Sequence, residues 1–357
     1  MLKKKIRIKD IAALAGVSVG TVDRVLHGRG KVSDEALQKV QETLEQIDYK
    51  PNLIARTLGS NKTYHIIAIM PDPALDDYWA QSNVGIEQAG TEWSAFDVQV
   101  HALFFDLYDI NSFTEVAQEI YKHKPDGILI APIFYKETLP FFEFCKAHNI
   151  PLILFNTNIP EAEPLSFIGQ NLYESGRVAA ELMHLAQPGP ATFAIIHSKE
   201  DNDNAVHLLQ KEKGFKAYFQ EKEAQDYSIK TVKLSSLNAV KPDDVLDALL
   251  QDPQLKGIYL SASSGTSYVA SFLEKRDRHD IKLIGYDLLQ ENILHMQKGT
   301  IDFLINQNPK RQALIGIRVL ANYLFLKKQP PATNLFPLEV ITRQNLNSYL
   351  EALNLNF

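Results

Sequence analysis

Eight short apolar runs recur between residues 65 and 287, and this repetition constrains the fold more than any other feature of the chain. Most of the runs are separated by ten to twenty residues of helix-forming sequence. The runs are HIIAIMPD, FDVQVHALFFD, PDGILIAP, IPLILFN, ATFAIIHS, SIKTVKLS, LKGIYLSA and IKLIGYD. The alternation predicts an α/β protein in which about ten strands form parallel sheets covered by helices. We expect two βαβ lobes that divide near 187–190.

Three short helices are predicted before these runs. Gly16 stands where a helix C-terminus favours positive φ, Ser18 and Ser33 can cap the second and third helices, and Gly28 and Gly30 end the second. The inward faces are Ile8, Ile11, Ala12 and Ala15 in the first helix, Val22, Val25 and Leu26 in the second, and Leu37, Val40, Leu44 and Ile47 in the third.

Charge is distributed unevenly along the 357 residues. Residues 1–62 carry about +5, whereas residues 63–357 carry about −11. A basic head on an acidic body suits a polyanion such as nucleic acid, which the body would repel. The alternative is a solvated surface with a chance excess of lysine.

The basic start followed by the apolar run 11–20 also resembles the beginning of a secretory signal. Lys9 and Asp10 interrupt the start of such a segment, Asp23 and Arg24 end it, and two further capped helices follow. The lone Cys145 fits a reducing compartment, because it cannot form an internal disulfide. We expect a cytoplasmic protein, with a secreted protein as the alternative.

Motifs of catalysis and metal binding are missing from the sequence. It contains no GxSxG, P-loop, HExxH or paired-cysteine motif, and its ten histidines are scattered. His27, His101 and His123 are expected at the surface or in caps. No window approaches eighteen uninterrupted apolar residues. We therefore expect no enzyme activity, no cofactor, no metal and no membrane span.

The first sixty residues resemble the DNA-binding headpiece of the LacI/GalR family of bacterial transcription regulators. The resemblance covers about fifty contiguous residues, IKDIAALAGVSVGTVDRVLHGRGKVSDEALQKVQETLEQIDYKPNLIARTL. It implies a helix-turn-helix whose second helix lies in the major groove, followed by a hinge helix that folds on DNA. The positions that match the family's DNA contacts are Val19, Gly20 and Arg24 for base reading, Thr21 for phosphate, and Leu58, beside Ala55, for the minor groove.

The side chains at these positions differ in what they can read. Arg24 can donate two hydrogen bonds to guanine, although a surface arginine can also contact phosphate alone. Val19 offers only apolar contact, and Gly20 has no side chain. Ala55 and Leu58 belong to an apolar stripe too short for a stable isolated helix, so a second copy would have to cover it.

Polar residues follow several of the predicted strands. Ligands of parallel sheets bind beyond the carboxyl ends of the strands, and between two lobes that region becomes a cleft. Carboxylates, amides and aromatic rings there suit a polyhydroxylated ligand, although each residue could instead solvate a loop or cap a helix. Asp72 ends the first strand, and the residues predicted to contact the ligand are Asp76, Tyr78, Trp79, Asn156, Asn171, Ser263, Asp287 and Gln307.

Residues 63–345 resemble the type I periplasmic sugar-binding fold, in particular its ribose-binding-like branch. DDYWAQSNVGI is similar to the aromatic loop of that fold, IPLILFN to its sugar-contacting strand end, and LIGYD and INQNP to its late Asp and Gln. Two departures are Ser263, where the family often has asparagine, and AVHLLQKEK before Gly214, which lacks the arginine that often grips the sugar.

These observations predict a DNA-binding regulator that responds to a small sugar-like effector. The alternative is a secreted sugar-binding protein of a transport system. The expected domains are a headpiece at 1–50, a hinge helix and linker at 51–62, and a ligand-binding domain at 63–357. Its lobes are expected at about 63–187 with 309–335, and at about 188–308 with 336–357. A homodimer on a near-palindromic operator is expected, since each headpiece reads one half-site.

Overall fold

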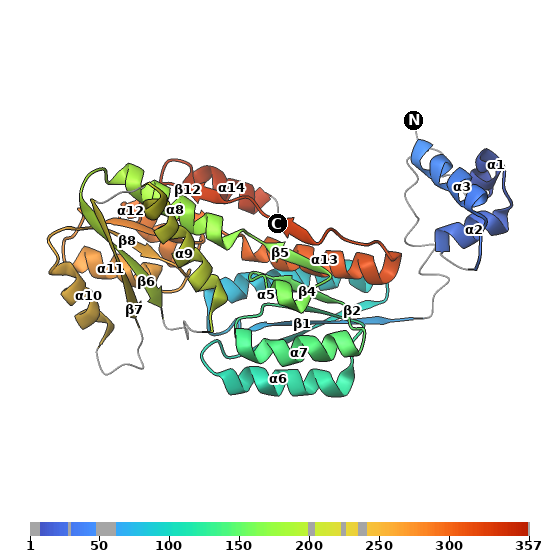
Figure 1. Ribbon diagram of the computed structural model, residues 1–357, viewed down its shortest axis with the longest axis horizontal. Coiled ribbons are helices and arrows are strands. Elements are labelled where there is room, and N and C mark those ends of the chain that lie inside the picture. Colours follow the sequence, from blue (N-terminus) through green and yellow to red (C-terminus); the bar gives the residue numbers. More distant parts are fainter. Residues whose placement is uncertain are drawn as a thin grey trace. The chain divides into compact units, whose positions relative to one another are not determined.

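A computed structural model describes residues 8–27, 30–47, 62–198, 204–222, 226–234 and 241–355 of the chain. The chain divides into two compact units, Met1–Asn61 and Lys62–Phe357, each of which is described by itself (Figure 1). Ala55 and Leu58, for which minor-groove contacts are predicted, lie outside the described residues. Within the described ranges, no helix has both the length and the apolar character that a membrane crossing needs.

The first unit contains α1 (Ile8–Ala15), α2 (Val19–His27) and α3 (Asp34–Gln46), which confirms the predicted three helices. Gly16 ends α1 with a φ of 65°, in the left-handed region that glycine tolerates. Ser18 Oγ accepts a hydrogen bond from the backbone N–H of Thr21 at 3.1 Å and so caps α2. The buried core of the unit consists of Ile11, Ala12, Ala15, Val22 and Val40.

One six-stranded, wholly parallel sheet forms the centre of the first lobe of the second unit. Its order is β11-β5-β4-β3-β1-β2. The strands are β1 (Tyr64–Pro71), β2 (Val98–Phe105), β3 (Gly127–Ile130), β4 (Leu152–Phe155), β5 (Ser166–Gly169) and β11 (Thr333–Leu335).

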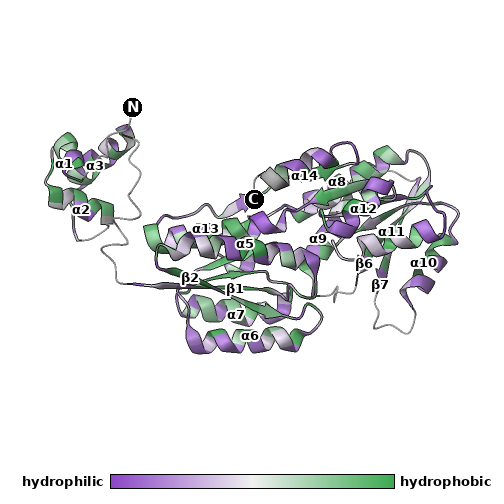
Figure 2. Ribbon diagram, turned by 180° about the vertical axis from the view of Figure 1, so that it is seen from behind, coloured by the Kyte–Doolittle hydropathy of each residue, from purple (hydrophilic) through white to green (hydrophobic). Residues whose placement is uncertain are grey.

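Helices cover both faces of this sheet. In Figure 1, α5 (Asp77–Ser94) and α13 (Pro309–Leu326) lie on one side of the strands, and α6 (Ile110–His123) and α7 (Tyr135–Ala147) lie on the other. The outer helix α6 buries Phe113, Ala117 and Ile120, and it carries both hydrophilic and hydrophobic residues in Figure 2. Burial on both faces explains why the central strands β3 and β4 are continuously apolar.

A second six-stranded sheet forms the second lobe, in the order β12-β10-β9-β8-β6-β7. All its neighbours are parallel except β10 and β12. The strands are β6 (Ala191–Ser198), β7 (Tyr227–Leu234), β8 (Leu255–Leu260), β9 (Lys282–Tyr286), β10 (Phe303–Asn306) and β12 (Glu339–Ile341). The helices are α8 (Leu172–Ala186), α9 (Val206–Glu221), α10 (Pro242–Leu250), α11 (Thr266–Lys275), α12 (Gln290–Lys298) and α14 (Leu346–Leu355).

Strand β6 shows how the second lobe is packed. Phe193 and Ile195 belong to the core under α8 and α9, whereas Ala194 and Ile196 belong to the core on the opposite face. Alternate side chains therefore fill two separate cores, as a central parallel strand requires. All eight quoted apolar runs contain a strand, so the predicted α/β fold is confirmed.

The chain passes three times between the lobes, after β5, after β10 and after β11. The first crossing is at Gln170–Asn171, whereas the sequence suggested a division near 187–190. The reason is that α8 packs against α9 in the second lobe, where Met183 shares a core with Phe193. The apparent break at 187–190 is only the turn between α8 and β6.

Helices α8 and α9 approach each other closely because both carry a glycine at the contact. A Cβ at Gly176 would lie 1.9 Å from the carbonyl oxygen of Lys211, and one at Gly214 would lie 1.9 Å from that of Tyr173. Only glycine permits this separation, so the pair fixes where α9 presents its side chains.

We expect Gly214→Ala to lower the free energy of unfolding by about 1–3 kcal/mol or more, because the added methyl group meets backbone. Urea unfolding measures the loss. Gly90→Ala is the matched control in α5, since its Cβ would lie 3.5 Å from Val100 Cβ, an ordinary contact. Equal stability of the two variants would contradict the close packing of α8 and α9.

Candidate functional site

Helix α2 presents a solvent-facing surface on the first unit. Val19 is 51% exposed, Gly20 and Arg24 are exposed, and Thr21 is partly buried with its Oγ1 2.9 Å from Ser18 Oγ. Val22 on the opposite side is fully buried and holds the helix on the core. The residues predicted to read bases are therefore accessible from outside the unit.

A cavity of about 40 Å³ lies between the two lobes, at the carboxyl ends of strands from both sheets; we call it the cleft cavity. Six of the eight residues in the predicted ligand site line it: Asp76, Tyr78, Trp79, Asn156, Ser263 and Gln307. Other lining residues include Leu107, Ile133, His207 and Lys211. The structure thus brings together residues from the loops after β1, β2, β3, β4, β8 and β10 and from helices α5 and α9.

Asp287, the seventh predicted residue, lies beneath this lining and is fully buried. It accepts hydrogen bonds from the backbone N–H and from Nε2 of Gln307, both at 2.7 Å, and from Ser263 Oγ. Burial raises the pKa of Asp287, while these hydrogen bonds oppose the rise. The carboxyl group therefore positions two lining side chains.

Asn156 and Tyr78 form the opposite wall, on the first lobe. Asn156 Nδ2 donates to the Tyr78 hydroxyl at 2.6 Å, and the Asn156 backbone N–H donates to Gln312 Oε1 at 3.1 Å. Burial raises the pKa of Tyr78 well above its ordinary value, so its hydroxyl remains protonated at neutral pH. The Trp79 ring stands edge-on to the Tyr78 ring at 4.9 Å and completes an aromatic wall.

Lys211 is the residue of this site that the sequence interpretation overlooked. It is 2% exposed and lines the cleft cavity. Its Nζ donates to the carbonyl oxygen of Ser261 at 3.0 Å and to Gln307 Oε1 at 3.3 Å, and it lies 3.6 Å from the centre of the Tyr286 ring. It belongs to AVHLLQKEK, the stretch in which an arginine was sought, so the position of a lysine three residues before Gly214 was the available signal.

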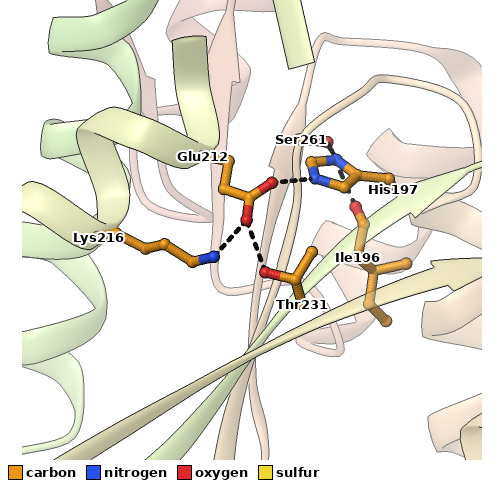
Figure 3. Close-up of polar contacts among 6 residues, drawn as sticks. All are labelled: Ile196, His197, Glu212, Lys216, Thr231 and Ser261. Atoms are coloured by element: carbon orange, nitrogen blue, oxygen red, sulfur yellow. Dashed lines mark hydrogen bonds and ion pairs between the residues drawn. The ribbon is translucent and has the colours of Figure 1, made fainter. Parts of the chain in front are cut away.

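A polar network behind Lys211 anchors α9 to the sheet (Figure 3). Glu212 Oε2 lies 2.6 Å from His197 Nε2 on β6, and Glu212 Oε1 accepts hydrogen bonds from Lys216 and from Thr231 on β7. His197 Nδ1 in turn lies 2.6 Å from Ser261 Oγ. The residue that follows Lys211 is therefore tied to two strands.

Asn171, the eighth predicted residue, does not line the cleft cavity. Its Oδ1 accepts a hydrogen bond from the backbone N–H of Glu174 at 3.1 Å and so caps α8. Asp72, also noted in the sequence, accepts from the N–H of Ala74 at 2.8 Å. Both side chains stabilise local turns. Asn171 lines a different cavity, beside the first crossing.

One chain thus combines a helix-turn-helix with a cavity between two α/β lobes. This combination defines a class of DNA-binding proteins that also bind a small ligand. Residues 67–328 match the family described as periplasmic binding protein domain, and residues 7–52 match the family described as bacterial regulatory proteins, lacI family. The chain belongs to the LacI family of bacterial regulators, with a ligand domain of the periplasmic binding protein type.

Curated relatives agree with this membership. The chain is 26% identical over 284 residues to the ribose operon repressor of Halalkalibacterium halodurans. The matched segment covers 78% of this chain and 80% of the relative. It is 25% identical over 305 residues to the sucrose operon repressor of Streptococcus mutans, over 79% and 82% of the two chains.

Solved structures share the fold of the second unit. A candidate LacI transcriptional regulator from Bacteroides fragilis superposes with a TM-score of 0.76 and 29% identity, over 81% of this chain and all of that chain. The glucose-galactose binding protein GanP of Geobacillus stearothermophilus gives a TM-score of 0.69 at 23% identity, over 80% and 99% of the chains, which shows the fold alone.

We expect Glu212→Gln to destabilise the protein by about 1–3 kcal/mol at pH 7, because buried His197 and two further donors lose a charged acceptor. Burial acts to raise the Glu212 pKa, but hydrogen bonds from Lys216, Thr231 and His197 lower it to about 2 from an ordinary 4.5. The stabilisation is thus complete above about pH 4.5 and is lost as the pH falls toward 2.

Urea unfolding between pH 7 and pH 3 measures the difference between wild type and Glu212→Gln, which should shrink as the pH falls. Glu163→Gln is the control, because Glu163 forms an exposed ion pair with Lys146 that contributes little. A difference that stayed constant down to pH 3 would show that the Glu212 charge does not stabilise the fold.

Proposed function

We propose that this protein is a cytoplasmic, homodimeric transcription repressor that binds a near-palindromic operator and responds to a sugar-like effector in the cleft cavity. One observation carries the proposal: a single chain combines an exposed helix of the helix-turn-helix type with a cavity lined from two lobes. The relatives named as ribose and sucrose operon repressors support carbohydrate genes as targets.

The DNA contacts are assigned to the exposed surface of α2. Arg24 donates to guanine, Val19 contacts a thymine methyl group and Thr21 contacts phosphate. Gly20 lets the backbone approach the base edges. Ala55 and Leu58 contribute the apolar hinge in the minor groove, paired with the same residues of a second copy.

The effector is assigned to the cleft cavity. Tyr78 and Trp79 cover an apolar face of the ligand, while Asn156, Gln307 and Asp76 exchange hydrogen bonds with its hydroxyl groups. Lys211 takes the place of a gripping arginine as a donor from α9. Because the cavity is lined by both lobes, a ligand that prefers one lobe arrangement by a few kcal/mol shifts the equilibrium between the two.

A secreted sugar-binding protein is the alternative function, and it is not favoured. It would account for the second unit, but it leaves the capped three-helix unit with its exposed Arg24 without a purpose. The solved sugar-binding proteins support only a shared fold for the second unit.

Operator binding tests the proposal. Arg24→Ala should weaken binding to a duplex from the protein's own upstream region by about 1–3 kcal/mol, roughly 5- to 150-fold, because the guanine contact is lost. Fluorescence anisotropy at about 50 and 200 mM salt gives the affinity and its salt dependence. Lys39→Ala is the control, since it removes a headpiece charge outside α2 whose partner is Glu35.

Equal losses of operator affinity in Arg24→Ala and Lys39→Ala would show that Arg24 contributes only non-specific charge to DNA binding. If neither the upstream duplex nor genome-wide selection in the presence of sugars yielded a specific site, the regulator function would be abandoned for the sugar-binding one.

Lys211→Met should raise the effector concentration needed for half-maximal change in operator binding by about tenfold or more, because a charged donor is lost from the cavity. The measurement uses ribose, sucrose and other neutral sugars with the operator duplex. Lys213→Met is the control, because Lys213 is exposed on the same helix. An unchanged effector response in Lys211→Met would remove Lys211 from the ligand site.

A further inference from the structure

A second cavity lies between the lobes beside the first crossing, and it is larger than the cleft cavity. Its volume is about 330 Å³, against about 40 Å³. We call it the crossing cavity. Its walls come from both lobes and include Asn158, Phe167, Gln170, Tyr173, Val206 and Gln210. It shares no lining residue with the cleft cavity.

Two elements, the loop after β4 and helix α9, nevertheless line both cavities with different residues. In the loop after β4, Asn156 lines the cleft cavity and Asn158 lines the crossing cavity. On α9, Lys211 faces the first and Val206 and Gln210 face the second. Whatever displaces this loop or the first turns of α9 therefore changes both cavities together.

Gln170, in the lining of the crossing cavity, connects the first crossing to the other two. The side chain is 3% exposed, and its Nε2 donates to the carbonyl oxygens of Asn306 at 2.9 Å and of Pro337 at 2.7 Å. A flipped amide would place three oxygens together, so this orientation is fixed. The Oε1 atom has no hydrogen-bond partner in the described part of the chain, but protein atoms enclose it, so a molecule in the cavity does not reach it.

The residues described as lining the crossing cavity include carboxamides, hydroxyls and two aromatic rings, and none of them is charged. This lining suits an uncharged molecule with hydroxyl groups, and the volume lies at the lower end of small-molecule sites.

We propose that the crossing cavity is a second small-molecule site, which takes an uncharged, hydroxyl-bearing ligand that exchanges hydrogen bonds with the carboxamides and hydroxyls of its lining. Because the walls belong to both lobes and to two elements shared with the cleft cavity, its occupant favours one lobe arrangement and modulates the response to the effector. The modulation rests on the proposed function, whereas the site itself does not.

Crystals of the full chain soaked separately in glycerol, erythritol and myo-inositol test the site. At least one polyol should occupy the cavity, with a hydroxyl about 3 Å from a carboxamide or hydroxyl group of the lining. Leu335→Trp should abolish its binding, since Leu335 lines the cavity and is 54% exposed. Leu185→Trp is the matched control, because Leu185 is 73% exposed on α8 and does not line the cavity.

Crystals that held only water in the cavity with all three polyols would overturn the site. A polyol that remained in Leu335→Trp would do the same, because its binding would not depend on the cavity.

Operator binding by the same variants tests the modulation. Leu335→Trp should shift the effector concentration for half-maximal response at least threefold relative to Leu185→Trp. An equal response in the two variants would overturn the modulation. A wild-type protein without operator binding would instead refute the proposed function, and the soaked crystals would still decide the site.

Discussion

The two hydrogen bonds from Gln170 Nε2 hold together the three passages of the chain between its lobes. Gln170 lies on the first passage, Asn306 begins the second and Pro337 lies on the third. The side-chain amide of Gln170 thus joins three backbone segments at the place where the chain passes between the lobes. These two hydrogen bonds therefore help to set how far apart the lobes lie, and with it the width of the cavities between them.

Left-handed backbone at strand ends directs the polar side chains into the cleft. Asn156 has a φ of 67° and Asp287 a φ of 64°, each directly after a strand. Asn and Asp adopt this region at lower cost than other residues with a side chain. The sharp turn carries Asn156 to the Tyr78 hydroxyl and lets Asp287 receive the Gln307 backbone, so ligand-site residues also shape the turns that hold them.

The sequence predicted the headpiece and the parallel sheets, because helix caps and long apolar runs are local signals. It missed the position of the first crossing, since α8 looks the same in either lobe. Strands β11 and β12, of three residues each, carry too little pattern to be recognised. Lys211 was overlooked because its burial depends on the close approach of α8 and α9, and Asn171 was included because a helix cap and a ligand contact use the same side chain.

The interleaving of the lobes has a consequence for synthesis on the ribosome. Helix α13 and strand β11 complete the first lobe, yet they follow the main part of the second lobe in the chain. Until α13 emerges, Leu129 lacks the helix surface at Gly316 against which it packs. The first unit is one continuous segment and can fold early, whereas neither lobe is complete until most of the other has been synthesised. A nascent chain therefore holds a finished headpiece before it has any finished lobe to control it.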